Sequence, residues 1–254
     1  MQAAGFRASL GVTRVASARV SAADPEFAFK VIVEQIIGVG FAVIGDMSSR
    51  PNFGLDELDF VLGTLIVGSI LNFSLMYLLA PVAGVAKSKS ALVQFVTGDL
   101  LKKFGAPQGH MFERGAYGLA SRANNFVYKA LQFGVLGFVA GITGTVITNT
   151  LITLRSKIDP SNVPEVEMPP VIPNSGCWAL HMAVSSNLRY QILNGLDMVL
   201  LGVLPQSAFR IYSTAVRSGN NILGGISFAT IARTLGVQKS GDADASKSKA
   251  AAKK

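Results

Sequence analysis

Several polar and ionisable residues interrupt apolar stretches of this sequence that are predicted to be helical. These residues are Glu34, Asn187, Arg189, Tyr190, Gln191, Asn194 and Asp197. An ionisable side chain at membrane depth is costly unless it is paired or faces water, so such residues are the first candidates for function in a membrane protein. Glu34 and Asp197 could hold the positive groups of a small solute, and Arg189 could hold a carboxylate. We therefore predict a substrate-binding site for a small polar molecule among these residues.

The candidates between 187 and 197 are predicted to share a polar face of one helix, because they recur at helical spacing. They are Asn187, Gln191, Asn194 and Asp197, with Tyr190 beside them. A lipid-facing helix would not tolerate such a face, so it points to protein or to a water-filled path. Hydrogen bonds to a neighbouring helix are the alternative. Arg189 points the other way, towards His181 and Ser185, where it could pair with Glu34 or bind lipid headgroups.

Two long uncharged stretches, 60–80 and 130–154, must position these residues. A helix needs about 20 apolar residues to cross the hydrocarbon layer, and each stretch is long enough. Half of the chain is hydrophobic and only 15% is charged. The sequence therefore predicts an all-α integral membrane helical bundle of about four transmembrane helices, with an amphipathic helical loop domain. The expected helices are about 25–45, 60–80, 130–154 and 176–204, with a short helix at 220–235 and a basic loop at 82–129.

The distribution of basic residues agrees with four spans. The loop from 81 to 129 carries seven Lys and Arg residues, whereas the link from 46 to 59 carries one. Both termini and the large loop would then lie on the positive side of the membrane. A three-span arrangement is the alternative, with the first helix in the interface and its Glu34 paired to Lys30. Residues 1–23 resemble an organelle transit leader, with an ordinary disordered basic N-terminus as the alternative. Residues 237–254 are predicted to be a disordered Lys-rich tail.

Small and polar residues on the third predicted span indicate close helix packing. Gly134, Gly137, Gly141 and Gly144 follow one another at steps of three or four residues and share one helix face. Small residues at such spacing let a second helix approach closely in a membrane. Asn149, further along the same span, is expected to form a hydrogen bond between helices.

Composition argues against several other functions. The net charge is +8, but no basic stripe is interleaved with aromatic residues, so we expect no nucleic-acid binding. Cys177 is the only cysteine, and His110 and His181 stand alone, so we expect no disulfide, metal or cofactor. No Ser, His and Asp constellation or carboxylate pair suggests an enzyme.

Four segments resemble the RETICULATA-related family of plant and algal proteins. They are ADPEFAFKVIVEQIIG from Ala23, GTVITNTLITLR ending at Arg155, MAVSSNLRYQILNG from Met182 and AVRSGNNILGGISFATIARTLGVQK from Ala215. The resemblance covers about residues 23–239 in the same order. It carries over family positions at Glu34, Asn149, Asn187, Leu188, Arg189, Tyr190, Gln191, Arg217 and Asn220.

The resemblance implies a multi-pass protein of the chloroplast inner envelope membrane, made with a transit peptide. It also implies transport of amino acids, basic ones in particular, and it has no settled catalytic residues to carry over. The leading hypothesis is thus a carrier of small polar metabolites such as a cationic amino acid, with membrane lipids and a second copy of the chain as further partners. The rival is a non-transporting scaffold that binds lipids or a partner through the basic loop 82–129.

Overall fold

The computed structural model describes residues 32, 35–79, 95, 98–158 and 168–238, and helices are the secondary structure of this part. Two segments are π-helical, η1 (Gln35–Val39) and η4 (His181–Ser186), and one is a 3-10 helix, η2 (Pro51–Glu57). The α-helices are α3 (Gly40–Ser48), α4 (Leu58–Leu79), α6 (Asp99–Lys103), α7 (Leu119–Ile158), α8 (Val171–Leu180), α9 (Asn187–Leu200) and α10 (Gln206–Thr234). The expected leader, the first part of the first predicted helix with Lys30 and Glu34, and residues 239–254 of the expected tail lie outside the described part.

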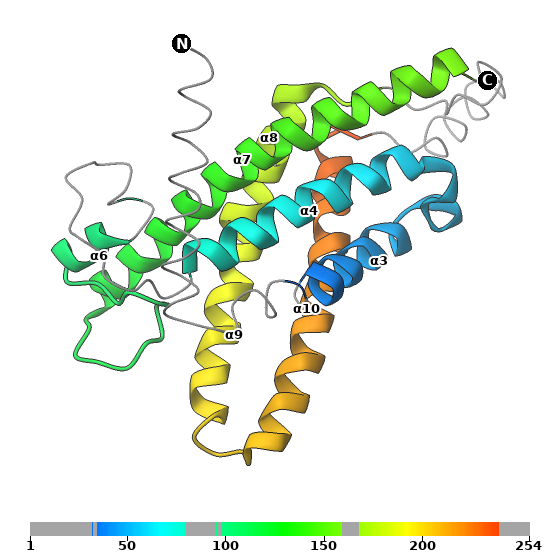
Figure 1. The fold of residues 1–254 in the computed structure, drawn as a ribbon. Helices are drawn as coiled ribbons and strands as arrows, with labels where there is room; N and C mark the ends of the chain where they lie inside the picture. The colour runs from blue at the N-terminus through cyan, green and yellow to red at the C-terminus, as the bar shows by residue number, and fades with distance from the viewer. Residues whose placement is uncertain (1–31, 33–34, 80–94, 96–97, 159–167, 239–254) are drawn as a thin grey trace, which may run out of the picture.

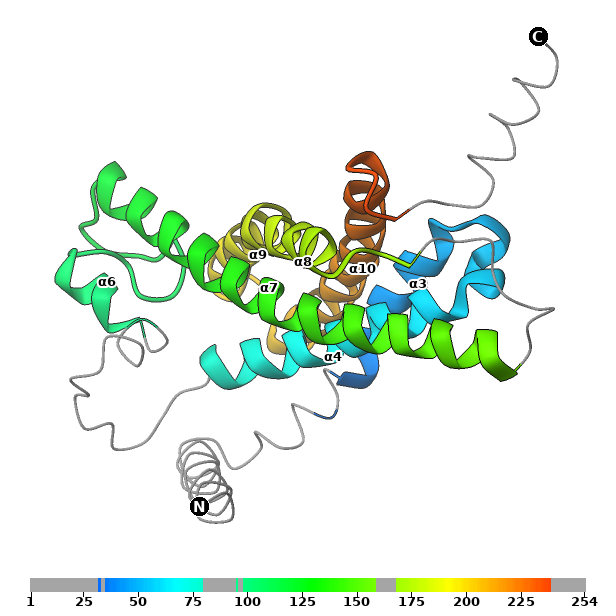
Figure 2. The same ribbon diagram turned by 90° about the horizontal axis from the view of Figure 1, so that it is seen from above.

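The long helix α7 organises the bundle. It has 40 residues, which corresponds to about 60 Å. It packs against α4 on one side and against α8 and η4 on another. In Figures 1 and 2, α8, η4 and α9 follow one another as a continuous helical path, and α10 returns from its end. The N-terminal helix α3 packs on α10, which closes the bundle opposite α7.

Several helices are longer than the apolar stretches predicted. The third helix runs over Leu119–Ile158 instead of 130–154, because Ser, Arg and Asn residues in its first turns are polar but do not break a helix. The fourth helical stretch begins at Val171 and ends at Leu200, and Pro173 lies in its first turn, where proline is tolerated. The last helix spans Gln206–Thr234 instead of 220–235 and begins directly after Pro205.

Two helices in the described part, α4 and α7, are long and apolar enough to cross a membrane. The path from α8 to α9 and the helix α10 are long enough but contain polar and charged residues, including Arg189, Asp197 and Arg217. Residues Gln35–Ser48 form a shorter apolar helix. Length and composition together thus identify as candidate spans the two helices that contain the long uncharged stretches 60–80 and 130–154.

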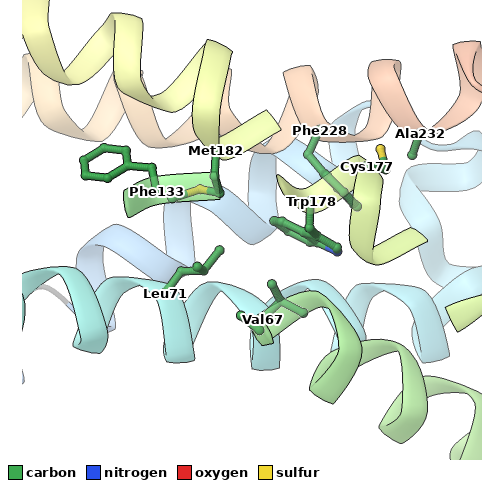
Figure 3. Close-up of a cluster of buried hydrophobic side chains, with 9 residues drawn as sticks. Val67, Leu71, Phe133, Cys177, Trp178, Met182, Phe228 and Ala232 are labelled. Carbon is green, nitrogen blue, oxygen red and sulfur yellow. The ribbon is translucent and has the colours of Figure 1, made fainter. Parts of the chain in front are cut away.

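The hydrophobic core lies where α4, α7, α8 and α10 meet. Its residues are Val67, Leu71, Phe133, Ala140, Cys177, Trp178, Met182, Phe228 and Ala232. Trp178 stacks on Phe228 with ring centroids 3.6 Å apart, and Figure 3 shows this indole between Phe228 and Val67. Burial of these aromatic rings fixes α8 against both α4 and α10.

The glycines of α7 lie at close helix contacts. A Cβ atom on Gly137 would come within 2.7 Å of the Trp178 carbonyl oxygen, and one on Gly141 within 2.9 Å of the Ser175 Cα. Gly134 faces Ala183 at 3.4 Å, whereas Gly144 faces Val67 of α4. The four glycines therefore pack against two neighbours. The first is α8 together with η4, and the second is α4. Asn149 donates a hydrogen bond to the Pro169 carbonyl oxygen at 3.0 Å, just before α8 begins.

A buried ion cluster joins α3 to η2. Arg50 donates to both carboxylate oxygens of Asp46, at 2.9 and 3.0 Å, and to Glu57 Oε2 at 2.7 Å. All three side chains are buried. Burial alone would lower the pKa of the Arg50 guanidinium, but the charges and hydrogen bonds of Asp46 and Glu57 outweigh it and raise this pKa. Arg50 therefore stays charged and holds both carboxylates.

Candidate solute-binding cavity

A cavity of about 520 Å³ lies between η1, α4, η4, α9 and α10. Its volume is in the range of sites for small ligands. Both π-helical segments of the described chain line it, η1 through Gly38 and Val39 and η4 through His181, Met182 and Ser186. Short π-helical segments inside longer helices occur often at functional sites. This cavity is therefore the strongest candidate for a binding site.

Arg189 lies in the cavity wall within a ring of hydrogen bonds. Its Nη1 donates to Ser185 Oγ at 2.5 Å and its Nη2 to Ser186 Oγ at 3.2 Å. Ser185 Oγ lies 2.8 Å from Ser227 Oγ on α10. His181 completes the ring, with Nδ1 3.2 Å from Ser227 Oγ and Nε2 3.3 Å from Ser186 Oγ. The ring joins η4, α9 and α10 and fixes the guanidinium beside the cavity.

Tyr190 and Asn194 also line the cavity. The Tyr190 ring packs edge-on against Phe133 with centroids 5.3 Å apart, and its hydroxyl donates to the Gly109 carbonyl oxygen at 3.1 Å. Asn194 donates its side-chain amide to the Tyr190 carbonyl oxygen one turn earlier, at 2.7 Å. Tyr190 thus connects the cavity to the loop that precedes α7.

Asn187 and Gln191 are fully buried and face away from the cavity, against α7 and the loop before it. Gln191 Nε2 donates to Asn125 Oδ1 at 3.2 Å and to Asn187 Oδ1 at 3.1 Å, and Gln191 Oε1 accepts from the Met111 amide at 2.7 Å. Asn187 donates to the Phe126 carbonyl oxygen at 3.0 Å. The polar face predicted for this helix is therefore divided. Asn187 and Gln191 form hydrogen bonds with α7 and the loop before it, whereas Asn194 lines the cavity.

The loop before α7 is held by the same amide cluster. Asn125 donates to the Pro107 carbonyl oxygen at 2.8 Å, and Arg122 donates to the Met111 carbonyl oxygen at 2.5 Å. Burial lowers the pKa of His110 in this loop, although the neighbouring Glu113 acts in the opposite direction. His110 is therefore neutral at physiological pH.

Replacing Gln191 with leucine should release this loop from α9. The change removes the acceptor of the Met111 amide and leaves Asn125 and Asn187 without one partner each, and a buried group without its partner costs about 1–3 kcal/mol. Hydrogen exchange at the Met111 amide should then become at least about tenfold faster. Asn194→Leu is the matched control, because the hydrogen bond that the structure describes for the Asn194 amide stays within its own helix. Unchanged exchange at Met111 in the Gln191 variant would show that the loop is held by other contacts.

Asp197 is tied to α10 instead of standing free in the cavity. Its Oδ2 lies 2.5 Å from Arg217 Nη2, and Arg217 Nε donates to Ser213 Oγ at 3.1 Å. A carboxylate engaged in this way is not the open counter-charge for a cationic solute that the sequence suggested. Glu34, the other predicted acid, lies outside the described residues.

The cavity also contains α10 residues that the sequence reasoning did not propose as ligands. Asn220, which stood only as a family position, Asn221 and Gly224 line the cavity, and Ser227 belongs to the Arg189 ring. Residues 220, 224 and 227 share a helix face, so their spacing was a signal. It was missed because the last helix was predicted to be short. Among the described residues, no group of three His, Cys, Asp or Glu side chains could hold a metal ion.

The fold and cavity define an all-helical protein with two helices of membrane-spanning length and a polar site among its helices. Residues 18–196 match the RETICULATA-like family model, described as Protein RETICULATA-related. The chain belongs to this family.

Three curated relatives from Arabidopsis thaliana show how close the similarity is. Protein RETICULATA-RELATED 3, chloroplastic, is 48% identical over 217 residues, and Protein RETICULATA-RELATED 2, chloroplastic, is 50% identical over 217 residues. Each alignment covers 85% of this chain and 62% of the relative. Protein RETICULATA, chloroplastic, is 32% identical over 227 residues, which cover 85% of this chain and 51% of the relative. The chain thus spans between 51% and 62% of the length of these relatives. No solved structure matches it.

Proposed function

We propose that this protein is a multi-pass membrane protein of the chloroplast inner envelope and carries small polar metabolites across it. The observation that supports this most strongly is the distribution of side chains on η4 and α9, where polar residues face the interior of the bundle and apolar residues face outward. The polar side chains of η4 and α9 face the cavity, α10, or α7 and the loop before it. Val184, Leu188, Ile192, Leu196 and Val199 are instead exposed on the outer surface. These five residues follow one another at steps of three or four, so they form one apolar stripe. Lipid is the environment that suits such a stripe.

A second apolar stripe lies on α7. Leu131, Val135, Val139 and Val146 are exposed and share one helix face. The opposite face of α7 carries the glycines that pack against α8 and α4. Helices with apolar outer faces and a polar cavity between them are typical of carriers, whose sites lie inside the bundle. The names of the chloroplastic relatives support the location in the chloroplast.

The count of four spans expected from the sequence comprises the first helix, α4, α7 and the path from α8 to α9. This path has 30 residues between Val171 and Leu200, enough to cross the hydrocarbon layer. Its charged residues have partners inside the bundle: Arg189 donates to two serines of η4, and Asp197 pairs with Arg217 of α10. Paired polar groups that face the bundle interior are compatible with a transmembrane helix.

A basic amino acid remains a suitable example of the transported solute. Arg189 would bind its carboxylate, as the sequence suggested, and the amide side chains of Asn194 and Asn220 would provide hydrogen bonds. The positive side chain would be held by Glu34 in this hypothesis. Asp197 contributes only if its ion pair with Arg217 opens.

Purified protein in liposomes should take up labelled lysine or arginine, and filling the cavity should stop this uptake. Gly68 lies in the cavity wall, and a Cβ atom there meets only Val39, at 3.6 Å. Gly68→Leu would therefore extend into the cavity, and we expect at least a tenfold lower uptake rate, or about 1.4 kcal/mol. Gly40→Leu is the control, because a Cβ atom there meets nothing within 4 Å.

The same preparation tests the membrane assignment and the rival function. The protein should resist carbonate extraction from chloroplast membranes, as an integral protein does. Folded protein that shows no uptake of either amino acid would contradict the carrier function. Co-purification of such inactive protein with one partner complex would instead support the scaffold that binds through the basic loop.

A further inference from the structure

We infer that a single buried water molecule occupies a small cavity between α4, α7 and α8 and links these helices by hydrogen bonds. The small cavity has a volume of about 10 Å³, which is close to the space that one water molecule needs. Its walls come from α4, α7, α8 and α10, with Pro169 before α8 and Gln238 after α10. The inference concerns the interior of the bundle and does not rest on the proposed carrier function.

The small cavity has a polar wall, although α4 and α7 are the helices of membrane-spanning length. Its apolar part includes Val67 and Trp178, whose side chains lie between α4 and α8 in Figure 3. Its polar part consists of five side chains that carry oxygen atoms, Thr64, Thr145, Thr148, Asn174 and Gln238. Cavities that stay dry are lined by apolar side chains, whereas a polar cavity of sufficient size can hold an ordered water molecule. The chemistry of this wall therefore favours water.

Thr148 gives the most direct evidence. It is 4% exposed, and none of the hydrogen bonds that the structure describes involves its hydroxyl. The hydroxyl points towards α4, because Thr148 Oγ1 is the atom closest to a Cβ atom built on Gly63. Four other threonines of α7 instead donate to a carbonyl oxygen one turn earlier in the helix, Thr143, Thr145, Thr150 and Thr153. A buried hydroxyl without a partner is costly, so the Thr148 hydroxyl calls for a ligand in the small cavity.

Asn174 offers the same water a second partner. Its Nδ2 donates to Thr145 Oγ1 at 2.7 Å, and its Oδ1 accepts from Gln238 Nε2 at 3.3 Å. A side-chain amide has two N–H groups and two lone pairs on its oxygen. Each of these two hydrogen bonds uses one of them, so one N–H group and one lone pair remain. The hydroxyl of Thr64, for which the structure also describes no hydrogen bond, is a third candidate partner.

A sodium ion is the alternative occupant, because hydroxyl and amide oxygens can also coordinate a hard cation. The described residues of the wall include no carboxylate. The charged group that this network reaches is the Arg50 guanidinium, whose Nη2 donates to Gln238 Oε1 at 3.1 Å. A cation in the small cavity would therefore be buried without a counter-charge in its wall, which is costly. A neutral water molecule fits the wall better.

The water would strengthen the contact between α4 and α7. Gly63 and Gly144 bring the two helices close together, since a Cβ atom on either residue would collide with the other helix. Lipid supplies no partner for a hydroxyl enclosed between them. A water held by Thr148, Thr64 and Asn174 would satisfy these groups, and it would join α4 to α7 and α8 by hydrogen bonds nearly as favourable as direct ones.

Radiolytic labelling of the full chain in lipid nanodiscs tests whether water is present. X-rays convert a water molecule to hydroxyl radicals in place, so a buried side chain beside an ordered water becomes oxidised. Phe60 is 3% exposed and lines the small cavity, but it does not line the cavity of about 520 Å³. We expect oxidation of Phe60, with incorporation of the heavy isotope after exchange into heavy-oxygen water. Tyr128, which is 7% exposed and lines neither cavity, is the internal control and should be oxidised less.

Thr148→Val, which replaces the hydroxyl with a methyl group of similar size, tests the role of this residue. The variant should reduce Phe60 oxidation to the level of the control, whereas Thr148→Ser keeps the hydroxyl and should retain the oxidation. Thr148→Val should also lower the Tm by about 2–4 °C, the shift expected for loss of one hydrogen bond in a protein of this size. Thr150→Val is the matched control, because Thr150 is exposed and bonds to the Val146 carbonyl oxygen of its own helix. It should leave Phe60 oxidation unchanged.

The sign of the change in Tm distinguishes a bound water from an unoccupied cavity. If the Thr148 hydroxyl has no ligand, Thr148→Val removes an unsatisfied buried group and should raise the Tm, which would contradict the inference. Wild-type Phe60 oxidised no more than Tyr128, or equal Phe60 oxidation in wild type and Thr148→Val, would contradict it as well. The Tm should be the same in sodium chloride and in choline chloride of equal concentration. A higher Tm in sodium that Thr148→Val abolishes would assign the small cavity to a cation and overturn the water.

Discussion

Replacing Arg50 with alanine should lower the free energy of unfolding by about 3–5 kcal/mol. Arg50 is 6% exposed, Asp46 is 0% exposed and Glu57 is 6% exposed, so the variant would leave two carboxylates buried without their shared cation. The guanidinium also lies over the Phe60 ring, 5.5 Å from its centroid. Unfolding of purified protein in mixed micelles, followed by circular dichroism, measures the change.

The expected loss comes from unpaired charge, and two further variants test this cause. Arg50→Met combined with Asp46→Asn and Glu57→Gln removes all three charges, so it should be more stable than Arg50→Met alone. Arg155→Met is the control, because the pair of Arg155 with Asp59 is partly exposed, at 29% and 14% of the two side chains. That change should cost about 1 kcal/mol or less. A triple variant as unstable as Arg50→Met would show that shape, and not charge, governs this cluster.

The Arg50 cluster matters because it connects parts of the chain that are far apart in sequence. Arg50 Nη2 donates to Gln238 Oε1 at 3.1 Å, and Gln238 donates to Asn174 Oδ1 at 3.3 Å. Asn174 in turn donates to Thr145 Oγ1 at 2.7 Å. One polar network therefore joins the end of α3, the residues after α10, the start of α8 and the middle of α7. Its loss should loosen the side of the bundle away from the loop 105–118.

The sequence predicted those features that depend on local patterns. The apolar stretches at 60–80 and 130–154 lie in α4 and α7, because hydrophobic runs and helix length are local properties. The glycines of α7 face other helices for the same reason, since their spacing alone puts them on one face. Neither the apolar stretches nor the glycine spacing requires knowledge of which helix lies opposite.

The site depends on contacts between distant residues, and these could not be read from local patterns. The sequence suggested that Asp197 is an unpaired acid, but α10 places Arg217, 20 positions later in the chain, beside its carboxylate. Asn187 and Gln191 shared a predicted face with Asn194, but α7 and its preceding loop occupy only part of that face. Arg50 lies in the segment 46–59, which the sequence indicated only as a link between helices, although its partners Asp46 and Glu57 lie within seven residues of it. Burial, which no composition reveals, made these polar residues structural.

Replacing Gly225 with alanine should be the most damaging methyl addition in α10. A Cβ atom there would lie 2.6 Å from the backbone nitrogen of Asp46 and closer still to the Ala42 carbonyl oxygen. The partner Gly45 is as tightly placed, since a Cβ atom on it would lie 2.8 Å from the Ile222 carbonyl carbon. Backbone atoms cannot turn aside as a side chain can, so α3 must move away from α10. We expect a loss of about 2–4 kcal/mol, at or above the usual cost of overpacking a core.

Gly219→Ala, six residues earlier in the same helix, separates this steric effect from helix propensity. A Cβ atom on Gly219 meets nothing within 4 Å, so alanine there should stabilise the protein by up to about 1 kcal/mol. The same chemical change should thus have opposite signs at two positions of one helix. Destabilisation at both positions would show that α10 needs glycine for its backbone and not for the contact with α3. Because Asn220, Gly224 and Gly225 all line the cavity, the Gly225 variant should also lower lysine uptake in liposomes, whereas Gly219→Ala should preserve it.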